Sequence, residues 1–292
     1  MQPMLSLPIT DWRAPHQGPA QAQAVETLER GAVLYLPALR FELEPDEQQF
    51  LTPDCLDGRR KNISLDPRKN RLQGTRLTGP QHEALLRMMR RFGEHALTLV
   101  EQLLPSYRTA ITQARVSYRP AEVDDRRLSP RKDDRKLHVD AFASRPNHGH
   151  RILRVFSNIN PEGRARHWRI GEPFEECARR FLPMIRPPLA GVHILLALLG
   201  VTRGRRSDYD HYMLQMHDRM KMDETYQHDA PRHEVNFAAG SSWIVFSDQT
   251  LHAALSGQYL LEQTLHLPVT AMRTPGHSPL SVLERIAGRT LA

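Results

Sequence analysis

The segment KLHVDAF, residues 136–142, places a histidine and an aspartate two positions apart within a short apolar run. Side chains alternate between the two faces of a β-strand, so His138 and Asp140 are expected on one face and the apolar residues on the other. Two groups that can ligate a metal, on one face of an apolar strand, either hydrogen-bond to each other in a core or share a ligand. The segment therefore predicts a strand with one chemically competent face.

His252 is the third residue of this predicted site. It lies between two predicted strands, far along the chain from His138, as expected where strands remote in sequence become neighbours in a barrel. Two imidazoles and one carboxylate form the facial triad of non-haem Fe(II) oxygenases, which leaves coordination positions open for O2 and a co-substrate. The chain has fifteen histidines, so a purely structural His–Asp hydrogen bond remains an open alternative.

The rest of the pattern predicts strands at 31–39, 114–120, 151–160, 241–248 and 257–270, and helices at 80–104, 173–181 and 207–227. This composition is mainly β with helices (α+β), and it favours a β-barrel or jelly roll with a helical N-terminal region and a helical insert. We expect one domain over 1–292, with the jelly-roll core at about 110–272 and an extension of helix and strand over 1–109.

The apolar stretch PLAGVHILLALLGV, residues 188–201, is shorter than the roughly 20 residues of a membrane-spanning helix. It is therefore predicted to be a buried core element, and no transmembrane segment is expected. The start of the chain lacks the pattern of a secretory signal. The two cysteines, Cys55 and Cys177, form no disulfide pattern and favour a reduced compartment.

Basic residues are concentrated rather than dispersed. The net charge is +7, and residues 59–76 hold seven Lys or Arg against one acid, Asp66. Such a surface attracts polyanions such as nucleic acid, anionic lipid or a phosphorylated or carboxylated substrate. A solvated basic face without a partner is the plain alternative. RNA-binding aromatic motifs are not evident, so nucleic acid is not expected as a partner.

Two blocks of sequence closely resemble the Kdo hydroxylases, which act on 3-deoxy-D-manno-oct-2-ulosonic acid (Kdo). They are HVDAFASRPNHGHRILRVFSNINPEGRARHWRIGEPFEE, from His138, and DQTLHAALSGQYLLEQTLHLPV, from Asp248. The resemblance implies an Fe(II)- and 2-oxoglutarate-dependent dioxygenase with a double-stranded β-helix fold. It implies iron held by His138, Asp140 and His252, with 2-oxoglutarate and O2 as co-substrates.

The resemblance also implies a substrate and a place of action. Carbon 3 of Kdo in the lipopolysaccharide inner core (Kdo-lipid A) would be hydroxylated, giving D-glycero-D-talo-oct-2-ulosonic acid. A carboxylated sugar on a phosphorylated lipid would suit the basic clusters. The expected enzyme is cytoplasmic and works at the anionic inner-membrane surface as a peripheral protein.

The anchor for 2-oxoglutarate needs a separate argument, because its distal carboxylate requires a cation that can bind both oxygens, normally Arg. The window QYLLEQTLHLP after His252 holds no Arg. The candidates are therefore arginines on neighbouring strands, with a glutamine as neutral helper: Arg119, Arg154, Arg166 and Gln263. Substrate-facing roles are predicted for Arg169 and Lys221.

Two other classes of function compete with the dioxygenase. One is a cupin-like metalloenzyme that uses the same three ligands with zinc or manganese for a non-oxidative reaction. The other is a non-catalytic protein that binds nucleic acid or lipid through the basic cluster at 59–76.

Overall fold

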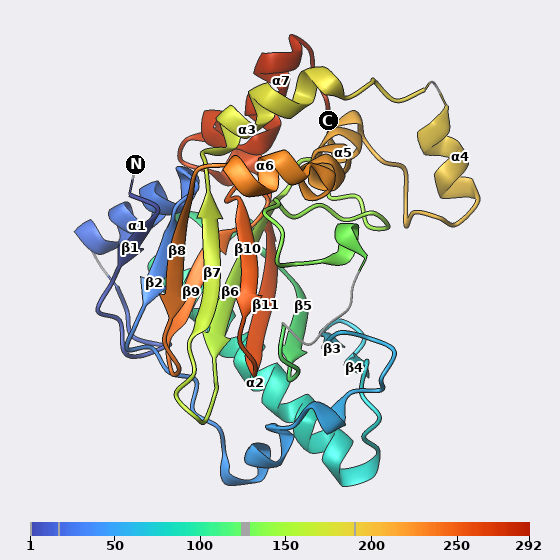
Figure 1. The fold of residues 1–292 in the computed structure, drawn as a ribbon. Helices are drawn as coiled ribbons and strands as arrows, with labels where there is room; N and C mark the ends of the chain where they lie inside the picture. The colour runs from blue at the N-terminus through green and yellow to red at the C-terminus, as the bar shows by residue number, and fades with distance from the viewer. Residues whose placement is uncertain (1, 17, 124–128, 190) are drawn as a thin grey trace.

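Two β-sheets, antiparallel except for the parallel pair at one edge of the larger sheet, pack face to face in the computed structural model, which describes residues 2–16, 18–123, 129–189 and 191–292 (Figure 1). The eight-stranded sheet has the order β1 (Met4–Ser6), β2 (Val33–Leu36), β9 (Ser242–Phe246), β6 (Arg151–Asn158), β11 (Leu260–Leu267), β5 (Thr112–Arg119), β3 (Ile63–Asp66) and β4 (Arg71–Gln73). The three-stranded sheet has the order β10 (His252–Ser256), β7 (Arg166–Gly171) and β8 (Arg232–Phe237). The predicted jelly-roll class, mainly β with helices, is confirmed.

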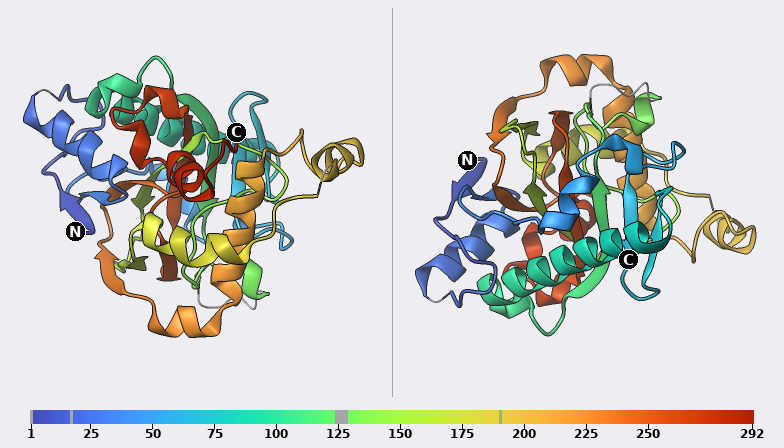
Figure 2. Two further views of the ribbon diagram at one scale, coloured as in Figure 1. Left: turned by 90° about the horizontal axis from the view of Figure 1, so that it is seen from above. Right: turned by 90° about the horizontal axis from the view of Figure 1, so that it is seen from below.

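Helices cover the sheets on two sides. The helices are α1 (Pro19–Glu29), α2 (Gly79–Leu103), α3 (Phe174–Phe181), α4 (Val192–Leu198), α5 (Asp208–Met222), α6 (Glu224–Asp229) and α7 (Pro279–Ala287). Helix α2 runs across the outer face of the large sheet, and α3, α5, α6 and α7 gather at one end of the sandwich (Figures 1 and 2). The face of the large sheet that α2 does not cover therefore lies inside the sandwich, opposite the small sheet.

The predicted helix at 80–104 forms as α2 because one stripe of its surface is apolar. Leu85, Met89, Phe92, Ala96 and Val100 recur at three- to four-residue spacing and are all buried against the large sheet. Proline lies in the first turn, where its missing N–H costs nothing, and Pro105 follows the end of the helix. Burial of this stripe determines which face of the large sheet packs against α2 and which face points between the two sheets.

Alternation on β11 assigns its two faces. Leu261 and Leu265 join the core under α2, whereas Glu262, Thr264 and His266 line the cavity between the sheets. The same period on β6 sends Arg154 into the cavity and Leu153 and Val155 into the core. These two central strands therefore place charged side chains at the floor of the cavity between the sheets.

The segment KLHVDAF differs from its prediction as a regular strand. It is extended, but only His138 forms a β-bridge, to His252, while Asp140 N–H donates to Ser247 O at 2.8 Å. The segment crosses between the two sheets and so cannot form a continuous ladder with either. Its alternation still holds, because Leu137 and Val139 pack into the helical cluster at the end of the sandwich.

The prediction that 188–201 is a buried core element is wrong for the described residues. Helix α4 stands away from the body of the protein (Figures 1 and 2), and Leu189 and Leu198 are 80% and 79% exposed. Helix α4 lies out past α5, away from both sheets and from the helical cluster at the end of the sandwich (Figure 1). His252 was expected in a turn and instead begins β10.

Candidate active site

His138, Asp140 and His252 meet at one end of the cavity between the sheets. One ligand atom from each residue lies within 4.8 Å of those of the other two. Paired backbone hydrogen bonds join His138 and His252, at 3.0 Å and 2.9 Å, and fix the two imidazoles side by side. Asp140 lies two residues further along the same extended segment, as the alternation predicted.

Backbone carbonyls orient both imidazole rings. The Nδ1 atom of His138 lies 2.7 Å from Lys136 O, and that of His252 lies 2.8 Å from Thr250 O. A carbonyl accepts from an N–H, so each ring carries its proton on Nδ1 and presents the Nε2 lone pair to the shared centre. The ring of Trp168 stacks on His252 with centroids 5.0 Å apart and restricts its rotation.

The charge states of the three groups suit a cation. Burial lowers the pKa of both imidazoles below the usual value, so they are neutral ligands near pH 7. Burial opposes ionisation of Asp140, but the guanidinium of Arg154 opposes this effect most strongly, and the pKa of this carboxyl is lowered. Two neutral nitrogens and one carboxylate are the donor set of the facial triad. The residues present therefore fit a divalent iron ion.

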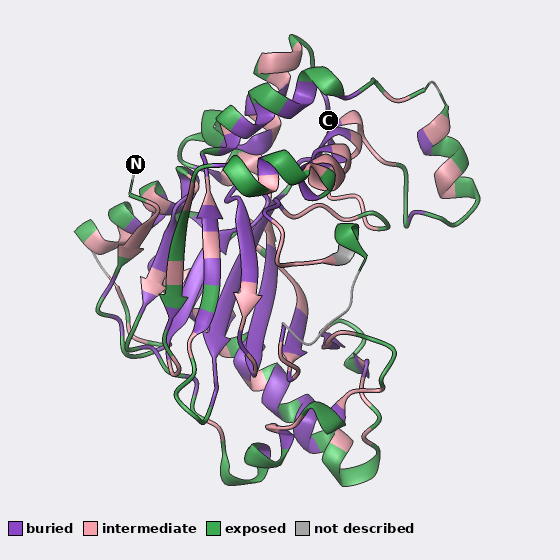
Figure 3. Ribbon diagram, in the orientation of Figure 1, coloured by how far each residue is buried: buried purple, intermediate pink, exposed green. Residues whose placement is uncertain are grey.

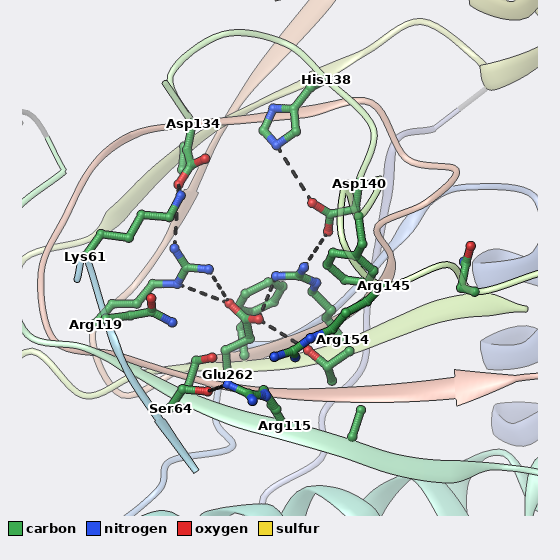
Figure 4. Close-up of a pocket in the computed structure, with 18 of the residues that line it drawn as sticks. Lys61, Ser64, Arg115, Arg119, Asp134, His138, Asp140, Arg145, Arg154 and Glu262 are labelled. Atoms are coloured by element: carbon green, nitrogen blue, oxygen red, sulfur yellow. Dashed lines mark hydrogen bonds and ion pairs between the residues drawn. The ribbon is translucent and has the colours of Figure 1, made fainter. Parts of the chain in front are cut away.

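Arginines and carboxylates form a connected chain from this centre along the floor of the cavity (Figure 4). Arg154 contacts Asp140 at 2.9 Å and Glu262 at 2.6 Å. Arg119 contacts the other oxygen of Glu262 at 2.7 Å. Glu262 thus holds two guanidinium groups close to a metal ligand, and these groups also lower the pKa of Glu262 against its burial.

Asp134 extends the chain to a second side of the cavity. Its carboxylate contacts Lys61 at 2.5 Å, Arg119 at 3.6 Å and Lys221 at 3.8 Å. Lys221 is almost fully buried, and it also donates to Arg131 O at 3.3 Å. Lys61 belongs to the basic cluster at 59–76, which therefore contributes to the cavity and is not only a solvated face.

Most of the predicted binding residues lie in the cavity. Arg119, Arg154, Arg166 and Lys221 all line it, and Arg166 donates to Gly257 O at 2.7 Å. The structure brings these four side chains, from three strands and a helix, around the same space as the triad.

Gln263 and Arg169 lie elsewhere, which corrects their predicted placement. Gln263 is on the opposite face of β11, beneath α2, where Gln113 donates to its side-chain oxygen at 3.0 Å. Arg169 is on the outer face of β7 and pairs with Glu234 at 3.1 Å. In both cases the alternation of side chains along a strand explains the position. Gln263 follows Glu262 and Arg169 follows Trp168, so each points to the face opposite the cavity.

Three further residues belong to the site. The position of Glu262 could have been predicted from the sequence. The alternation that places Thr264 and His266 on the cavity face of β11 also places Glu262 there. Trp168 lies two residues after Arg166 on β7 and also lines the cavity, and among the described residues its buried Nε1–H has no hydrogen-bond partner. His217 on α5 donates through Nδ1 to Val139 O at 2.8 Å, with its ring edge-on to His138.

Beyond the triad the cavity is large and cationic. Its volume is about 1170 Å³, and its described lining holds eleven Lys and Arg side chains against three carboxylates. Arg115, Arg145 and Arg203 lie toward its outer part, where burial and their mutual repulsion lower the pKa of Arg115 and Arg145. A cavity of this charge favours a ligand with several negative charges.

Known proteins match the chain along its whole length. The family described as 3-deoxy-D-manno-oct-2-ulosonic acid (Kdo) hydroxylase matches residues 11–290. A solved structure of the Kdo hydroxylase KdoO, a non-heme Fe(II) alphaketoglutarate dependent dioxygenase in complex with alphaketoglutarate and Fe(III), is 45% identical. It superposes with a TM-score of 0.97 over 100% of this chain and 98% of that one.

A second KdoO structure, in complex with succinate and Fe(III), is 46% identical with a TM-score of 0.96, over 99% of this chain and 97% of that one. No protein matched in a search of curated sequences. The predicted resemblance is confirmed by the family match and by these structures: the chain belongs to the Kdo hydroxylase family.

Proposed function

We propose that this Fe(II)- and 2-oxoglutarate-dependent dioxygenase hydroxylates carbon 3 of Kdo in a lipid-linked acceptor, giving D-glycero-D-talo-oct-2-ulosonic acid. The observation that carries the proposal is the facial triad in a cavity whose described lining holds eleven Lys and Arg side chains. Family membership and the Fe- and alphaketoglutarate-bound relatives support the same reaction.

His138, Asp140 and His252 would hold the iron. When bound, iron with 2-oxoglutarate and O2 supplies an oxidant that inserts one oxygen atom into a C–H bond, while 2-oxoglutarate becomes succinate and CO2. The chain's own part is to orient the ligands through Lys136 O and Thr250 O and to keep Asp140 ionised through Arg154.

The co-substrate would lie against Arg119, Arg154 and Arg166. Glu262 prevents two of these guanidinium groups from leaving the floor of the cavity, so they are positioned before a ligand binds. A buried arginine with a rigid partner is well suited to a carboxylate. The indole N–H of Trp168 provides a further donor at the same place, and Gln263 is not part of this proposal.

The sugar would occupy the outer part of the cavity. Its carboxylate and the phosphates of a lipid anchor would meet Arg115, Arg145 and Arg203, with Lys221 closer to the metal centre. The cavity exceeds the volume that one small sugar acid requires, which favours an acceptor with further groups attached.

We place this reaction at the cytoplasmic face of the inner membrane. Cys55 and Cys177 are both buried free thiols, as in a reduced compartment. Among the described residues, no helix combines the length and apolar character needed to cross a bilayer. Association with the membrane would therefore depend on the surface of the protein.

Mass spectrometry tests the proposal. Kdo-lipid A incubated with enzyme, Fe(II) and 2-oxoglutarate should gain one oxygen atom, with one succinate formed for each hydroxylated sugar. Free Kdo in parallel tests whether the lipid is required, and fragmentation identifies the carbon that is hydroxylated. Metal-dependent turnover of Kdo-lipid A without 2-oxoglutarate would contradict the proposal and favour a non-oxidative metalloenzyme.

A further inference from the structure

Helix α4 and its flanks expose an apolar surface that the rest of the described chain does not cover. We define the α4 arm as residues 186–189 and 191–206. Eight large apolar side chains are exposed among the described residues, and six of them lie in this arm: Leu189, Ile194, Leu195, Leu198, Leu199 and Val201. Figure 3 shows the exposed faces of α4 clear of the protein body. A concentrated apolar patch on a projecting element indicates an interaction surface.

The charges at the base of the α4 arm identify the kind of partner. Residues 186–206 contain four arginines, at positions 186, 203, 205 and 206, and no Asp or Glu. Apolar side chains at the tip with arginines at both ends are the pattern of a segment that lies in the interface of an anionic bilayer. Long arginine side chains can reach lipid phosphates while their stems remain among apolar groups.

A hollow beneath α4 supports the same partner. It lies between α4 and α5, has a volume of about 450 Å³, and is lined by Arg186, Arg206, Arg219 and His193 among other residues. His193 is 8% exposed, and within the described chain neither of its ring nitrogens has a hydrogen-bond partner; its nearest carboxylate is Asp208 at 3.7 Å. Three guanidinium groups around buried, unsatisfied donors suit a phosphate group.

The α4 arm is continuous with the rim of the active-site cavity. Arg203 lines that cavity, and its N–H donates to Ser144 O at 2.9 Å. The guanidinium of Arg206 donates to Ala143 O. Both acceptors follow closely after Asp140, so the base of the arm and the metal-binding segment are held together.

We propose that the α4 arm inserts into the surface of an anionic bilayer. Its apolar side chains lie among the acyl chains, and its arginines and the hollow beneath α4 meet lipid phosphates. The mouth of the active-site cavity is then held at the membrane surface, where a lipid-linked sugar can enter without leaving the bilayer. Only this last consequence rests on the proposed function.

Flotation with vesicles that carry no Kdo tests the insertion. The full-length protein is mixed with phosphatidylcholine vesicles with or without 30% phosphatidylglycerol, a mixture chosen to give about the negative surface potential of a bacterial membrane. Wild type should float only with the anionic vesicles, and Leu195→Glu/Leu198→Glu should bind at least about tenfold more weakly. Arg186→Gln/Arg205→Gln should weaken binding about 30-fold, the factor expected for two cations near an anionic surface.

Met222→Glu is the matched control, because Met222 is an exposed apolar side chain outside the α4 arm, 50% exposed. It should float like wild type. Insertion is read directly from Leu198→Trp, whose fluorescence should be quenched by lipids with brominated acyl chains. The three native tryptophans, Trp12, Trp168 and Trp243, are buried and should remain unquenched.

Several results would overturn the proposal. Wild type that does not float, or Leu195→Glu/Leu198→Glu that floats equally well, would exclude insertion of the arm. Equal binding to neutral vesicles would exclude the role of the arginines. A wild-type dimer that Leu195→Glu/Leu198→Glu converts to a monomer would show that a second copy of the chain covers the arm.

Turnover separates this inference from the proposed function. The Leu195→Glu/Leu198→Glu variant should hydroxylate substrate dispersed in detergent at the wild-type rate and fail on substrate embedded in vesicles. If wild type floats but hydroxylates nothing, the proposed function fails and the inference stands.

Discussion

Strand β6 carries two buried arginines, Arg151 and Arg154, on opposite faces of the same sheet. Arg151 is fully buried on the core side, contacts Asp248 at 2.7 Å and Gln249 at 2.6 Å, and lies over the ring of Phe246. Arg154 faces the cavity and joins Asp140 to Glu262. Within the described chain its Nε–H has no hydrogen-bond partner.

The two sites teach how one kind of ion pair serves two purposes. A buried charge must be paired and hydrogen-bonded, and the core around Arg151 is closed, so that pair can act only on stability. The ion pairs of Arg154 border a large cavity and include the metal ligand Asp140. The Nε–H of Arg154, which has no partner in the described chain, is therefore available to a molecule bound in the cavity. Burial by itself does not distinguish a structural arginine from a functional one. The distinction is whether the ion pair is enclosed by the core or borders a cavity that can bind a molecule.

Removal of a metal ligand should give the largest effect on the cavity side. His138→Ala should abolish hydroxylation, because loss of residues that merely support a ligand already costs 10- to 100-fold in roughly comparable metal sites. The free energy of unfolding should change little. His228→Ala, at a side chain 87% exposed, is the control and should retain full turnover. Equal turnover by both variants would remove the triad from the mechanism.

On the core side, Arg151→Met should chiefly affect stability. It leaves Asp248 buried without its cation, and breaking such a pair costs about 3–5 kcal/mol. Denaturant unfolding measures this loss, and the 2-oxoglutarate KM of the folded fraction should equal that of wild type. A stability loss below that of Arg154→Met would reverse the proposed division between the two sites.

Arg154→Met should chiefly affect the binding of 2-oxoglutarate rather than stability. Glu262 keeps its contact with Arg119, so the loss of stability should be smaller than for Arg151→Met, while the KM for 2-oxoglutarate should rise about 10- to 100-fold. Steady-state kinetics and denaturant unfolding on the same preparation provide both values. An unchanged KM would show that Arg154 only orients Asp140.

The dependence of stability on pH tests the role of Glu262. Its folded-state pKa lies below the usual 4.5, because Arg154 and Arg119 outweigh the effect of its burial. A lowered carboxyl pKa contributes stability that is present above about pH 4.5 and is lost as the pH falls through the folded-state value. Metal-free Glu262→Gln should therefore lose less stability than wild type between pH 5 and pH 3, roughly, in denaturant titrations. If the free energy of unfolding fell equally with pH in wild type and Glu262→Gln, the ion pairs of Glu262 would contribute nothing to the pH dependence of stability.

The smallest effect is expected at Arg169, on the outer face of β7. Its pair with Glu234 is exposed, so Arg169→Ala should change stability by less than about 0.5 kcal/mol. Hydroxylation should also be unchanged, because the side chain does not reach the cavity. A raised KM for the sugar would restore the substrate-facing role predicted from the sequence.

Local periodicity accounts for what the sequence predicts well. The alternation in KLHVDAF places His138 and Asp140 together, and the helical spacing of 80–104 predicts α2 almost to its ends. Arg154 could be predicted because an arginine amid Ile, Leu, Val and Phe needs a buried partner. That partner, Glu262, depends on the register between β6 and β11, which pairs Glu262 with Phe156 and cannot be read from either strand alone.

The predictions from sequence were wrong where tertiary structure determines the position of a residue or segment. Gln263 was assigned to the cavity from its position near the second histidine, although one step along a strand reverses the face. The stretch 188–201 was assigned to the core from its composition, but composition does not reveal whether a loop returns the element to the body. In this protein it does not, and the α4 arm results.

Binding of 2-oxoglutarate to the protein with and without Co(II), measured anaerobically by calorimetry, tests the central claim most directly. The claim is that the triad and the cavity arginines form one site for metal and co-substrate together. We predict one equivalent of 2-oxoglutarate bound to the Co(II)-loaded protein and affinity at least about tenfold weaker without metal. Binding of equal strength in both states would contradict the account, because the arginines would then hold the co-substrate independently of the triad.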